Sequence, residues 1–113
     1  MFKKTHRLTK TKDIEKVFKQ GRSFYNNLLG IKAVVNDLDI SRSTVITNLK
    51  VSKKAVVRNR VKRQVRSVLE AELPKLKSGF DLAVVCLPTI VGQDKSDIER
   101  LLKQALAKLA LYQ

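Results

Sequence analysis

Cysteine, histidine and glycine are scarce in this chain of 113 residues. The only cysteine is Cys86 and the only histidine is His6, so the chain can form no internal disulfide and has no zinc-ligand spacing. Its four glycines are scattered, which excludes a glycine-rich phosphate loop. No uninterrupted apolar run approaches the length of about 20 residues that a membrane-spanning helix needs. Disulfide scaffolds, zinc modules, P-loop enzymes and membrane spans are therefore not predicted.

Acidic residues are also few, and this shortage sets the charge of the molecule. Ten Asp and Glu stand against 24 Lys and Arg, which gives a net charge of +14. A field of that size favours a phosphate-rich partner. Nucleic acid is favoured over an anionic membrane, because the leucine-rich segment near the C-terminus is not the strongly basic one. At this length we expect a single RNA-binding domain over residues 1–113 with a modest core.

The segment 57–69 combines helical apolar spacing with a concentration of cations. At about 100° per residue, one arc of the helix collects apolar side chains and the opposite arc collects cations. No acidic residue occurs between Asp39 and Glu70, whereas a merely solvated helix face normally mixes both signs. The pattern therefore favours a polyanion partner. The apolar arc is Val57, Val61, Val65, Val68 and Leu69, and the opposite arc is Arg58, Asn59, Lys62, Arg63 and Arg66.

The first half of the chain predicts an arm, a helix and strands. Residues 1–12 hold five cations and no acid, which indicates a mobile or RNA-clamping arm. A short helix follows, with Thr11 as its cap and Gly21 ending it in a left-handed conformation. From about residue 22 the period changes, and β-branched runs at 29–35 and 44–51 predict strands that form a hairpin. Alternation along the second run puts Asn48 and Lys50 on a polar side of the sheet, which Lys32 could join.

The second half predicts the basic helix over 56–73, a strand over 80–87 and a last helix. Pro74 breaks the chain before the strand, and Ser96 begins the last helix with a capping box to Glu99. The resulting order is α-β-β-β-α-β-α. We expect an α/β (α+β) two-layer sandwich, with a small, mostly antiparallel sheet and helices packed mainly on one face.

The sequence contains no recognisable catalytic motif. His6 lies in the basic arm, where a lone histidine is usually solvated, and no nucleophile has a histidine base in a recognisable motif. Cys86 lies in an apolar run, which predicts a buried small hydrophobe. The few carboxylates do not cluster as a metal site requires. We therefore predict no catalytic residue and no metal bound by this chain, and the absence of a secretory signal predicts a cytoplasmic protein.

The basic segment also carries a resemblance to a known family. Ser52-Lys53-Lys54, followed by a helix containing Arg58-Asn59-Arg60, resembles the protein component of bacterial ribonuclease P. The resemblance covers nearly the whole chain. It includes Arg7-Leu8, residues 13–18 and 21–23, the strand that ends at Pro88 and the final helix.

This resemblance implies a fold, a function and a set of contacts. The implied fold has a left-handed βαβ crossover. The implied function is the magnesium-dependent removal of 5′ leaders from precursor tRNA by a separate catalytic RNA, with no cofactor bound by the protein alone. The implied RNA-subunit contacts are Lys53, Lys54, Arg58, Asn59, Arg60, Lys62, Arg63 and Arg66. The implied contacts with the precursor-tRNA leader are Arg7, Ile14, Phe18, Lys32, Asn48 and Lys50.

The chain departs from the family pattern at two places. A Gly-Asn spacer usually precedes the signature helix, whereas here Lys54 runs directly into Ala55, so the turn must be tighter or the helix must start later. Ile14 and Lys32 stand where aromatic residues are common, which weakens stacking by about 1–3 kcal/mol per lost base platform. Phe18 remains, although its spacing with Ile14 suits core packing equally well.

Two other functions are weighed beside this one. A ribosomal or other structural RNA-binding protein would share the basic helix but would show no preference for leader-bearing tRNA. A DNA-binding regulator would need a helix-turn-helix, and the residues before Val57 are predicted as strand. The partners we expect are therefore the catalytic RNA and precursor tRNA, with neither DNA nor membrane.

Overall fold

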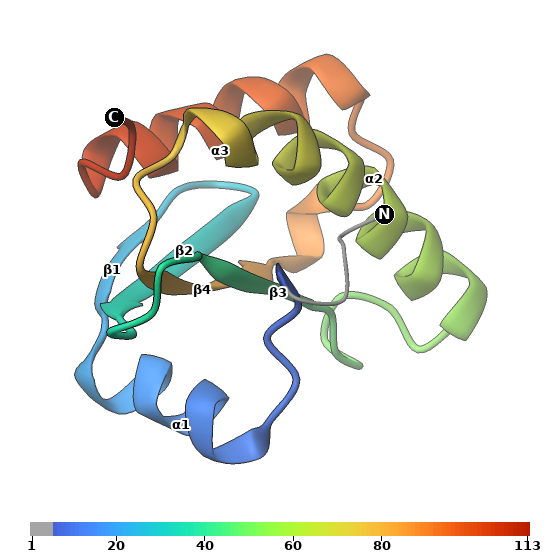
Figure 1. Ribbon diagram of the computed structural model, residues 1–113. Coiled ribbons are helices and arrows are strands. Elements are labelled where there is room, and N and C mark those ends of the chain that lie inside the picture. The colour runs from blue at the N-terminus through green and yellow to red at the C-terminus, as the bar shows by residue number, and fades with distance from the viewer. Residues whose placement is uncertain (1–5) are drawn as a thin grey trace.

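The computed structural model describes residues 6–113, which form three α-helices and four strands (Figure 1). Their order confirms the predicted α-β-β-β-α-β-α arrangement, and short 3₁₀ turns follow α2 and β4. The elements are α1 (Thr11–Gln20), β1 (Arg22–Tyr25), β2 (Leu29–Val35), β3 (Arg42–Ile46), α2 (Ala55–Glu72), β4 (Phe80–Cys86) and α3 (Lys95–Lys108).

The four strands form one sheet in the order β1-β2-β4-β3. β2 pairs antiparallel with both β1 and β4, and β3 pairs parallel with β4. The hairpin predicted between residues 29–35 and 44–51 is therefore wrong, because β4 lies between the two strands. β4 is an apolar run that is buried along most of its length, so the centre of the sheet is the position that suits it.

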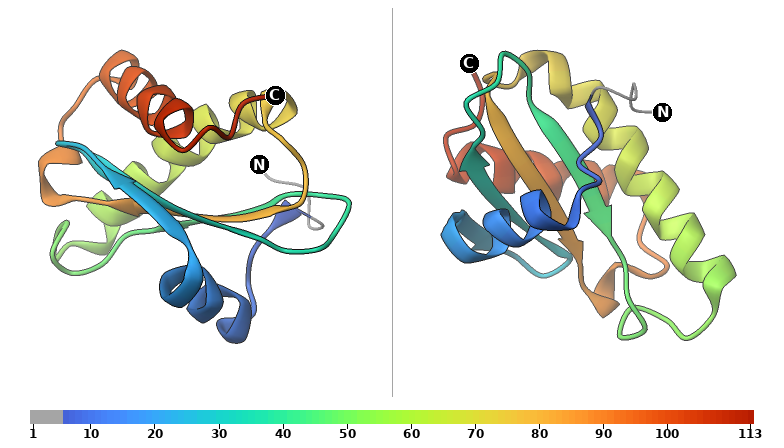
Figure 2. Two further views of the ribbon diagram at one scale, coloured as in Figure 1. Left: turned by 90° about the vertical axis from the view of Figure 1, so that its left-hand side faces the viewer. Right: turned by 60° about the horizontal axis from the view of Figure 1, so that its bottom comes forward.

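The connection from β3 through α2 to β4 joins two neighbouring parallel strands. Viewed with α2 behind the sheet, as in the right panel of Figure 2, this crossover is left-handed. About 98% of crossover connections between parallel strands of one sheet are right-handed. The crossover implied by the family resemblance is thus present.

Two helices cover one face of the sheet and one helix lies on the other (Figures 1 and 2). The main core fills the space between the sheet and the α2–α3 layer, with Leu29 and Ile31 of β2 meeting Leu69 and Leu106 from the helices. A smaller cluster forms under α1, where Val17 packs with Leu8 and Ala83. The predicted sandwich with helices mainly on one face is confirmed.

The helix ends differ from those predicted. Thr11 is the first residue of α1 rather than its cap, and Gly21 is extended, with φ −73°, rather than left-handed. Glycine is nevertheless required there, since a Cβ would lie 2.3 Å from the Val17 carbonyl oxygen. Asp94 precedes α3, so Ser96 lies inside the first turn and the predicted capping box is wrong. Local sequence signals located these ends to within two residues but misassigned their hydrogen bonds.

The described part of the predicted arm lies against the edge of β3. Leu8 donates its backbone N–H to the Ser43 carbonyl at 2.9 Å, and Arg7 forms an isolated parallel bridge with Ser43. His6 is half-buried rather than solvated, because its Nδ1 lies 2.9 Å from the Ser41 carbonyl oxygen. The rest of the arm prediction falls on residues 1–5, which lie outside the described residues. From His6 to Leu8 the chain therefore extends the sheet by one short bridge.

Candidate nucleic-acid interface

The outward side of α2 carries most of the predicted RNA contacts. Its apolar stripe, centred on Val61 and Val65, is buried against the sheet and α3, which turns the opposite side to solvent. The first turn of α2 contains no acidic residue, and the acids of this helix, Glu70 and Glu72, lie in its last turn, after the last of the cations. The cations therefore stand on one face without acid between them. Asn59, Arg60 and Arg63 are exposed, and Lys62 and Arg66 are half-buried.

A shallow groove of about 580 Å³ runs along this side of α2. Its lining residues recur every three or four positions, so they form a strip along the helix axis. Val56, whose side chain is 76% exposed, is its one apolar residue. Arginine can bind phosphate through two parallel N–H groups, and a valine can contact the face of a sugar or base. The lining residues are Val56, Asn59, Lys62, Arg63 and Arg66.

The cations continue past the N-terminal end of α2. Lys54 occupies the cap position and Lys53 precedes it, and both are exposed. The N-terminal end of a helix carries a partial positive charge, so cations there do not stabilise the helix. The same arrangement attracts an anion, because the backbone N–H groups and the lysines act in the same direction. The predicted RNA contacts at Lys53 and Lys54 thus adjoin the basic side of α2.

Arg58 differs from the other cations of α2. The sequence pattern assigned it to the arc opposite the apolar residues, but it is half-buried at the border of the core. Its Nη1 donates a hydrogen bond to the Ser52 carbonyl at 2.9 Å. At about 100° per residue Arg58 lies only about 60° from Val61, which explains its position. Its assignment to the outward arc is therefore wrong.

The segment between β3 and α2 is a turn rather than a strand. β3 ends at Ile46, and Asn48 accepts hydrogen bonds from Lys50 and Val51 through its side chain and its carbonyl, both at 3.0 Å. Asn48 and Lys50 are exposed on this turn, so their predicted place on a strand is wrong. Leu49 is also exposed, whereas Val51 is buried and anchors the turn to the core. Lys50 consequently lies in the loop that leads into α2, apart from Lys32.

An aromatic and a cationic side chain meet where α1 lies over the sheet. The Lys32 Nζ is 5.5 Å from the centre of the Phe18 ring and 5.8 Å from the centre of the Tyr25 ring. Both distances lie within the range of cation–π attraction. Phe18 is 40% exposed while its neighbour Val17 is fully buried, so Phe18 is a surface residue rather than a core residue. We call Phe18, Tyr25 and Lys32 the aromatic–lysine cluster.

Tyr25 is the member of this cluster that the sequence analysis missed. It lies opposite Gly30 in the β1–β2 pair, and the missing side chain of Gly30 leaves room for its ring. A Cβ at Gly30 would lie 2.2 Å from the ring. A tyrosine paired across two strands with a glycine is a signal that could have identified the site, but the register is not readable from sequence.

The remaining predicted leader contacts lie at the margins of the α1 side. Ile14 is half-buried and packs against the small cluster under α1, so it contributes mainly to the core. Arg7 is exposed beside β3. The structure thus brings Phe18 and Lys32 together, places Arg7 and Ile14 near the same layer, and separates Asn48 and Lys50 from them.

Residues 6–113 show no candidate metal centre. No group of three or more His, Cys, Asp or Glu side chains within this range could hold a metal ion. Cys86 is buried as predicted, and burial raises the pKa of its thiol from 9.0 to about 12 despite a smaller opposing effect of Lys62. Across the same range no helix combines the length and the apolar character that crossing a bilayer requires.

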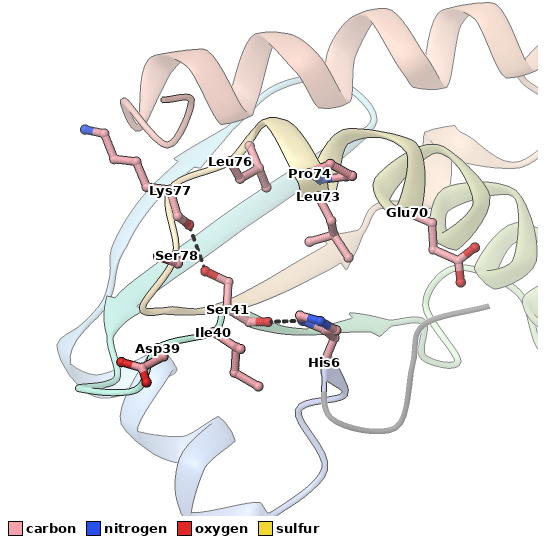
Figure 3. Close-up of a pocket in the computed structure, with 10 residues that line it drawn as sticks. All are labelled: His6, Asp39, Ile40, Ser41, Glu70, Leu73, Pro74, Leu76, Lys77 and Ser78. Carbon is pink, nitrogen blue, oxygen red and sulfur yellow. Dashed lines mark hydrogen bonds between the residues drawn. The ribbon is translucent and has the colours of Figure 1, made fainter.

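A separate pocket of about 470 Å³ lies where the described start of the chain meets the end of α2 (Figure 3). His6, Glu70 and Lys77 line it beside apolar side chains that include Leu73. The Ser41 hydroxyl donates to the Lys77 carbonyl at 2.8 Å and ties the pocket's two sides together. None of the predicted site residues lines this pocket.

Comparison with known proteins agrees with the fold and the signature. Residues 2–110 match the family described as Ribonuclease P. The chain is 38% identical to the ribonuclease P protein component of Synechocystis sp., over 96% of this chain and 88% of that protein. It is 34% identical to the ribonuclease P protein component of Cyanothece sp., over 96% of this chain and 95% of that protein.

Two solved structures share the fold. The ribonuclease P protein from Thermotoga maritima superimposes with a TM-score of 0.81 at 26% identity, over 90% of this chain and 96% of that one. The ribonuclease P protein from Staphylococcus aureus superimposes with a TM-score of 0.86 at 21% identity, over 96% of this chain and 98% of that one. From the family match, the identities and the shared fold it follows that this chain belongs to the bacterial ribonuclease P protein family.

Proposed function

We propose that this chain is the protein subunit of ribonuclease P, which binds the catalytic RNA and the 5′ leader of precursor tRNA. In this role it promotes magnesium-dependent removal of the leader in the cytoplasm. The observation that carries the proposal is the run of cations without acid on the outward side of α2 as far as Arg66, continuous with the lysines that precede it. The proposed contacts with the catalytic RNA are Lys53, Lys54, Asn59, Arg60, Lys62, Arg63 and Arg66, with Arg58 beside them.

The protein contributes charge and position rather than bond cleavage. Each Lys or Arg that binds a phosphate releases counterions and draws two negatively charged RNA segments closer than they would otherwise approach. The carboxylates of residues 6–113 do not cluster as a metal site requires, so the proposed role of this chain does not include holding a metal. The magnesium of the proposed reaction belongs to the ribonucleoprotein holoenzyme.

The leader is proposed to bind on the α1 side of the sheet, at the aromatic–lysine cluster. Phe18 and Tyr25 offer ring faces on which unpaired bases can stack, and Lys32 lies between them to bind a phosphate. Tyr25 supplies a second aromatic platform beside Phe18. Arg7 and Ile14 flank this surface, and Asn48 and Lys50 would meet the strand only where it continues toward α2.

Cleavage of a precursor tRNA at low magnesium tests the subunit role. The protein alone, the RNA subunit of the same organism alone and the mixture are compared. We expect leader removal in the mixture only. Binding of the two components without any gain in cleavage would instead support a structural RNA-binding protein.

Leader recognition is tested by comparing affinities for precursor and mature tRNA. We expect Phe18→Ala and Tyr25→Ala each to weaken binding of the holoenzyme to precursor tRNA by about 5- to 150-fold, the range that one stacked base contributes, and to leave binding of mature tRNA unaffected. Leu38→Ala, which removes an exposed apolar side chain from the turn after β2, is the control. Equal losses for both tRNAs would remove the leader from this surface.

A further inference from the structure

The turn before α2 is connected to the helix by one side-chain hydrogen bond. Arg58 reaches back six positions, and its Nη1 donates to the Ser52 carbonyl at 2.9 Å. Its side chain is half-buried at the border of the core, whereas Arg60 on the same helix is exposed. Among residues 6–113, Arg60 makes no hydrogen bond or ion pair. Two arginines of the Arg-Asn-Arg signature thus have different surroundings.

Ser52 is the last residue before the two exposed lysines, so its position determines where they lie. The Ser52 hydroxyl accepts the backbone N–H of Lys54 at 3.1 Å. On the other side, Val51 is buried and fixes the turn in the core. The Ser52 carbonyl is therefore held by Arg58, while the Ser52 side chain holds Lys54.

Without this bond Lys54 would keep its hydrogen bond to the Ser52 hydroxyl and the one that its carbonyl accepts from the Arg58 backbone N–H, both at 3.1 Å, but the Ser52 carbonyl would lose its link to the helix. Lys53 and Lys54 are exposed, carry like charges and lie at the positive end of the α2 dipole, so electrostatic repulsion favours their separation. A guanidinium is suited to the bracing role, because it donates several N–H groups in a rigid plane and remains charged.

We propose that Arg58 is a positioning residue, which braces the Ser52 carbonyl so that Lys53 and Lys54 face the same RNA segment as the outward side of α2. In this role its guanidinium acts through the turn and does not itself bind a phosphate. The inference rests on the proposed binding of catalytic RNA by this surface.

The brace predicts a specific pattern in the salt dependence of RNA binding. The affinity of the protein for the catalytic RNA in the holoenzyme is measured over a series of salt concentrations. Four proteins are compared: the wild type, Arg58→Ala, the double variant Lys53→Ala/Lys54→Ala and the triple variant that combines all three substitutions. We expect Arg58→Ala to weaken binding in the wild-type background, because the lysines lose their contacts. In the double-variant background we expect Arg58→Ala to change the affinity by less than about twofold, since the effects of coupled residues do not add.

A direct phosphate contact would give a different result. It would lower the magnitude of the log–log salt slope by about 0.7–0.9 in both backgrounds. Such a loss in the double-variant background would overturn the proposal. Arg60→Ala is the matched control, and we expect it to lower the slope by that amount in either background.

Arg58→citrulline separates the hydrogen bond from the charge. Citrulline keeps the length and an N–H donor for the Ser52 carbonyl but is neutral. We expect it to retain the wild-type slope and to stay within about threefold of the wild-type affinity, whereas the loss of a phosphate contact would make it resemble Arg58→Ala. The citrulline result therefore decides the question even if Arg58→Ala frays the start of α2, which far-ultraviolet circular dichroism would report.

The two proposals fail in distinguishable ways. If Lys53→Ala/Lys54→Ala and Arg60→Ala both leave RNA affinity unchanged, the interface itself is wrong, and the brace is overturned with it. If those variants weaken binding as expected while Arg58→Ala still lowers the slope in the double-variant background, only the brace is wrong.

Discussion

Arg42 and Asp81 join the two parallel strands through charge. The Arg42 Nε and Nη2 donate to the two carboxylate oxygens of Asp81 at 2.9 and 2.7 Å. Asn36 donates a third hydrogen bond to Asp81 at 2.9 Å, and Asp13 of α1 lies 3.3 Å from the Arg42 Nη1. The Asp81 side chain is only 3% exposed, so these donors take the place of the water that a surface carboxylate would bind. This network ties α1 to the sheet.

Removing the guanidinium should be costly because it leaves a buried carboxylate underpaired. We expect Arg42→Ala to lower the free energy of unfolding by about 3–5 kcal/mol, measured by urea titration followed by circular dichroism. Arg100→Ala is the control, since Arg100 pairs with Asp97 on the surface at 3.6 Å and should cost about 0–1 kcal/mol. Similar losses in the two variants would show that the buried pair has no special weight.

Cys86 is expected to be unreactive in the folded protein. Its side chain is 3% exposed, and burial raises the pKa of the thiol to about 12, so almost no thiolate exists near neutral pH. A thiol reagent should therefore modify the native protein only slowly, and modify the urea-unfolded protein at the rate of a free cysteine. Rapid modification of the native protein at low reagent concentration would contradict this burial.

Gly30 matters through the space that it leaves for Tyr25. A Cβ at position 30 would lie 2.2 Å from the ring, so Gly30→Ala must displace the tyrosine. We expect this variant to lose about as much preference for precursor tRNA as Tyr25→Ala. The double variant should be no worse than either single variant, because both act through the same ring. Additive losses in the binding assay would indicate separate roles.

At the scale of elements, the end of α2 is held against the C-terminal residues by contacts of Glu72 and Leu76 with Tyr112, which we call the clasp. Tyr112 donates to the buried Glu72 carboxylate at 2.7 Å, Lys75 lies 3.3 Å from it, and Leu76 forms an antiparallel bridge with Tyr112. Burial alone would raise the pKa of Glu72, but the hydrogen bonds from Tyr112 and Lys75 outweigh it and hold this pKa below its ordinary value of 4.5. The clasp therefore favours the charged carboxylate.

This clasp predicts an acid-sensitive contribution to stability. Because the pKa of Glu72 is lower in the folded state, its contribution is present above pH 4.5 and is lost as the pH falls through the folded-state pKa. We expect Tyr112→Phe to weaken this dependence, measured by urea unfolding on both sides of pH 4.5. The control is Tyr25→Phe, which removes the hydroxyl of an exposed tyrosine and should leave the acid dependence of stability unchanged. An acid dependence that is the same in Tyr112→Phe would exclude the hydrogen bond as its cause.

At the scale of the whole molecule, the charge of +14 should make RNA binding strongly salt-dependent. If about five cations of α2 and its preceding turn bind phosphates, log affinity should fall with log salt at a slope of about −3.5 to −4.5. Arg63→Ala should make the slope shallower by about 0.7–0.9. Lys103→Ala, on α3 beside Glu99, should leave it unchanged. A slope unaffected by Arg63→Ala would place the RNA elsewhere on the protein.

Much of this molecule follows from its sequence. Helical spacing of Val61 and Val65 fixed the buried side of α2, because a stripe of apolar residues has to leave water whatever it packs against. The absence of acid between Asp39 and Glu70 likewise determined that α2 carries only positive charge up to its last turn. The Arg58-Asn59-Arg60 signature pointed to the family that the comparisons then established.

Only the tertiary structure decided which strands are neighbours and which side chains meet. The sequence favoured a hairpin between β2 and β3, but pairing across a sheet depends on contacts between distant segments, and β4 took the place between them. The same long-range pairing set Tyr25 opposite Gly30 and placed Lys32 between two rings. Arg58 was misassigned because its angle, about 60° from Val61, places it beside the buried stripe, and only the structure showed its hydrogen bond to the Ser52 carbonyl. Local sequence patterns determine whether a side chain is buried or exposed to water. Which residues it contacts depends on the pairing of segments that are distant in the sequence.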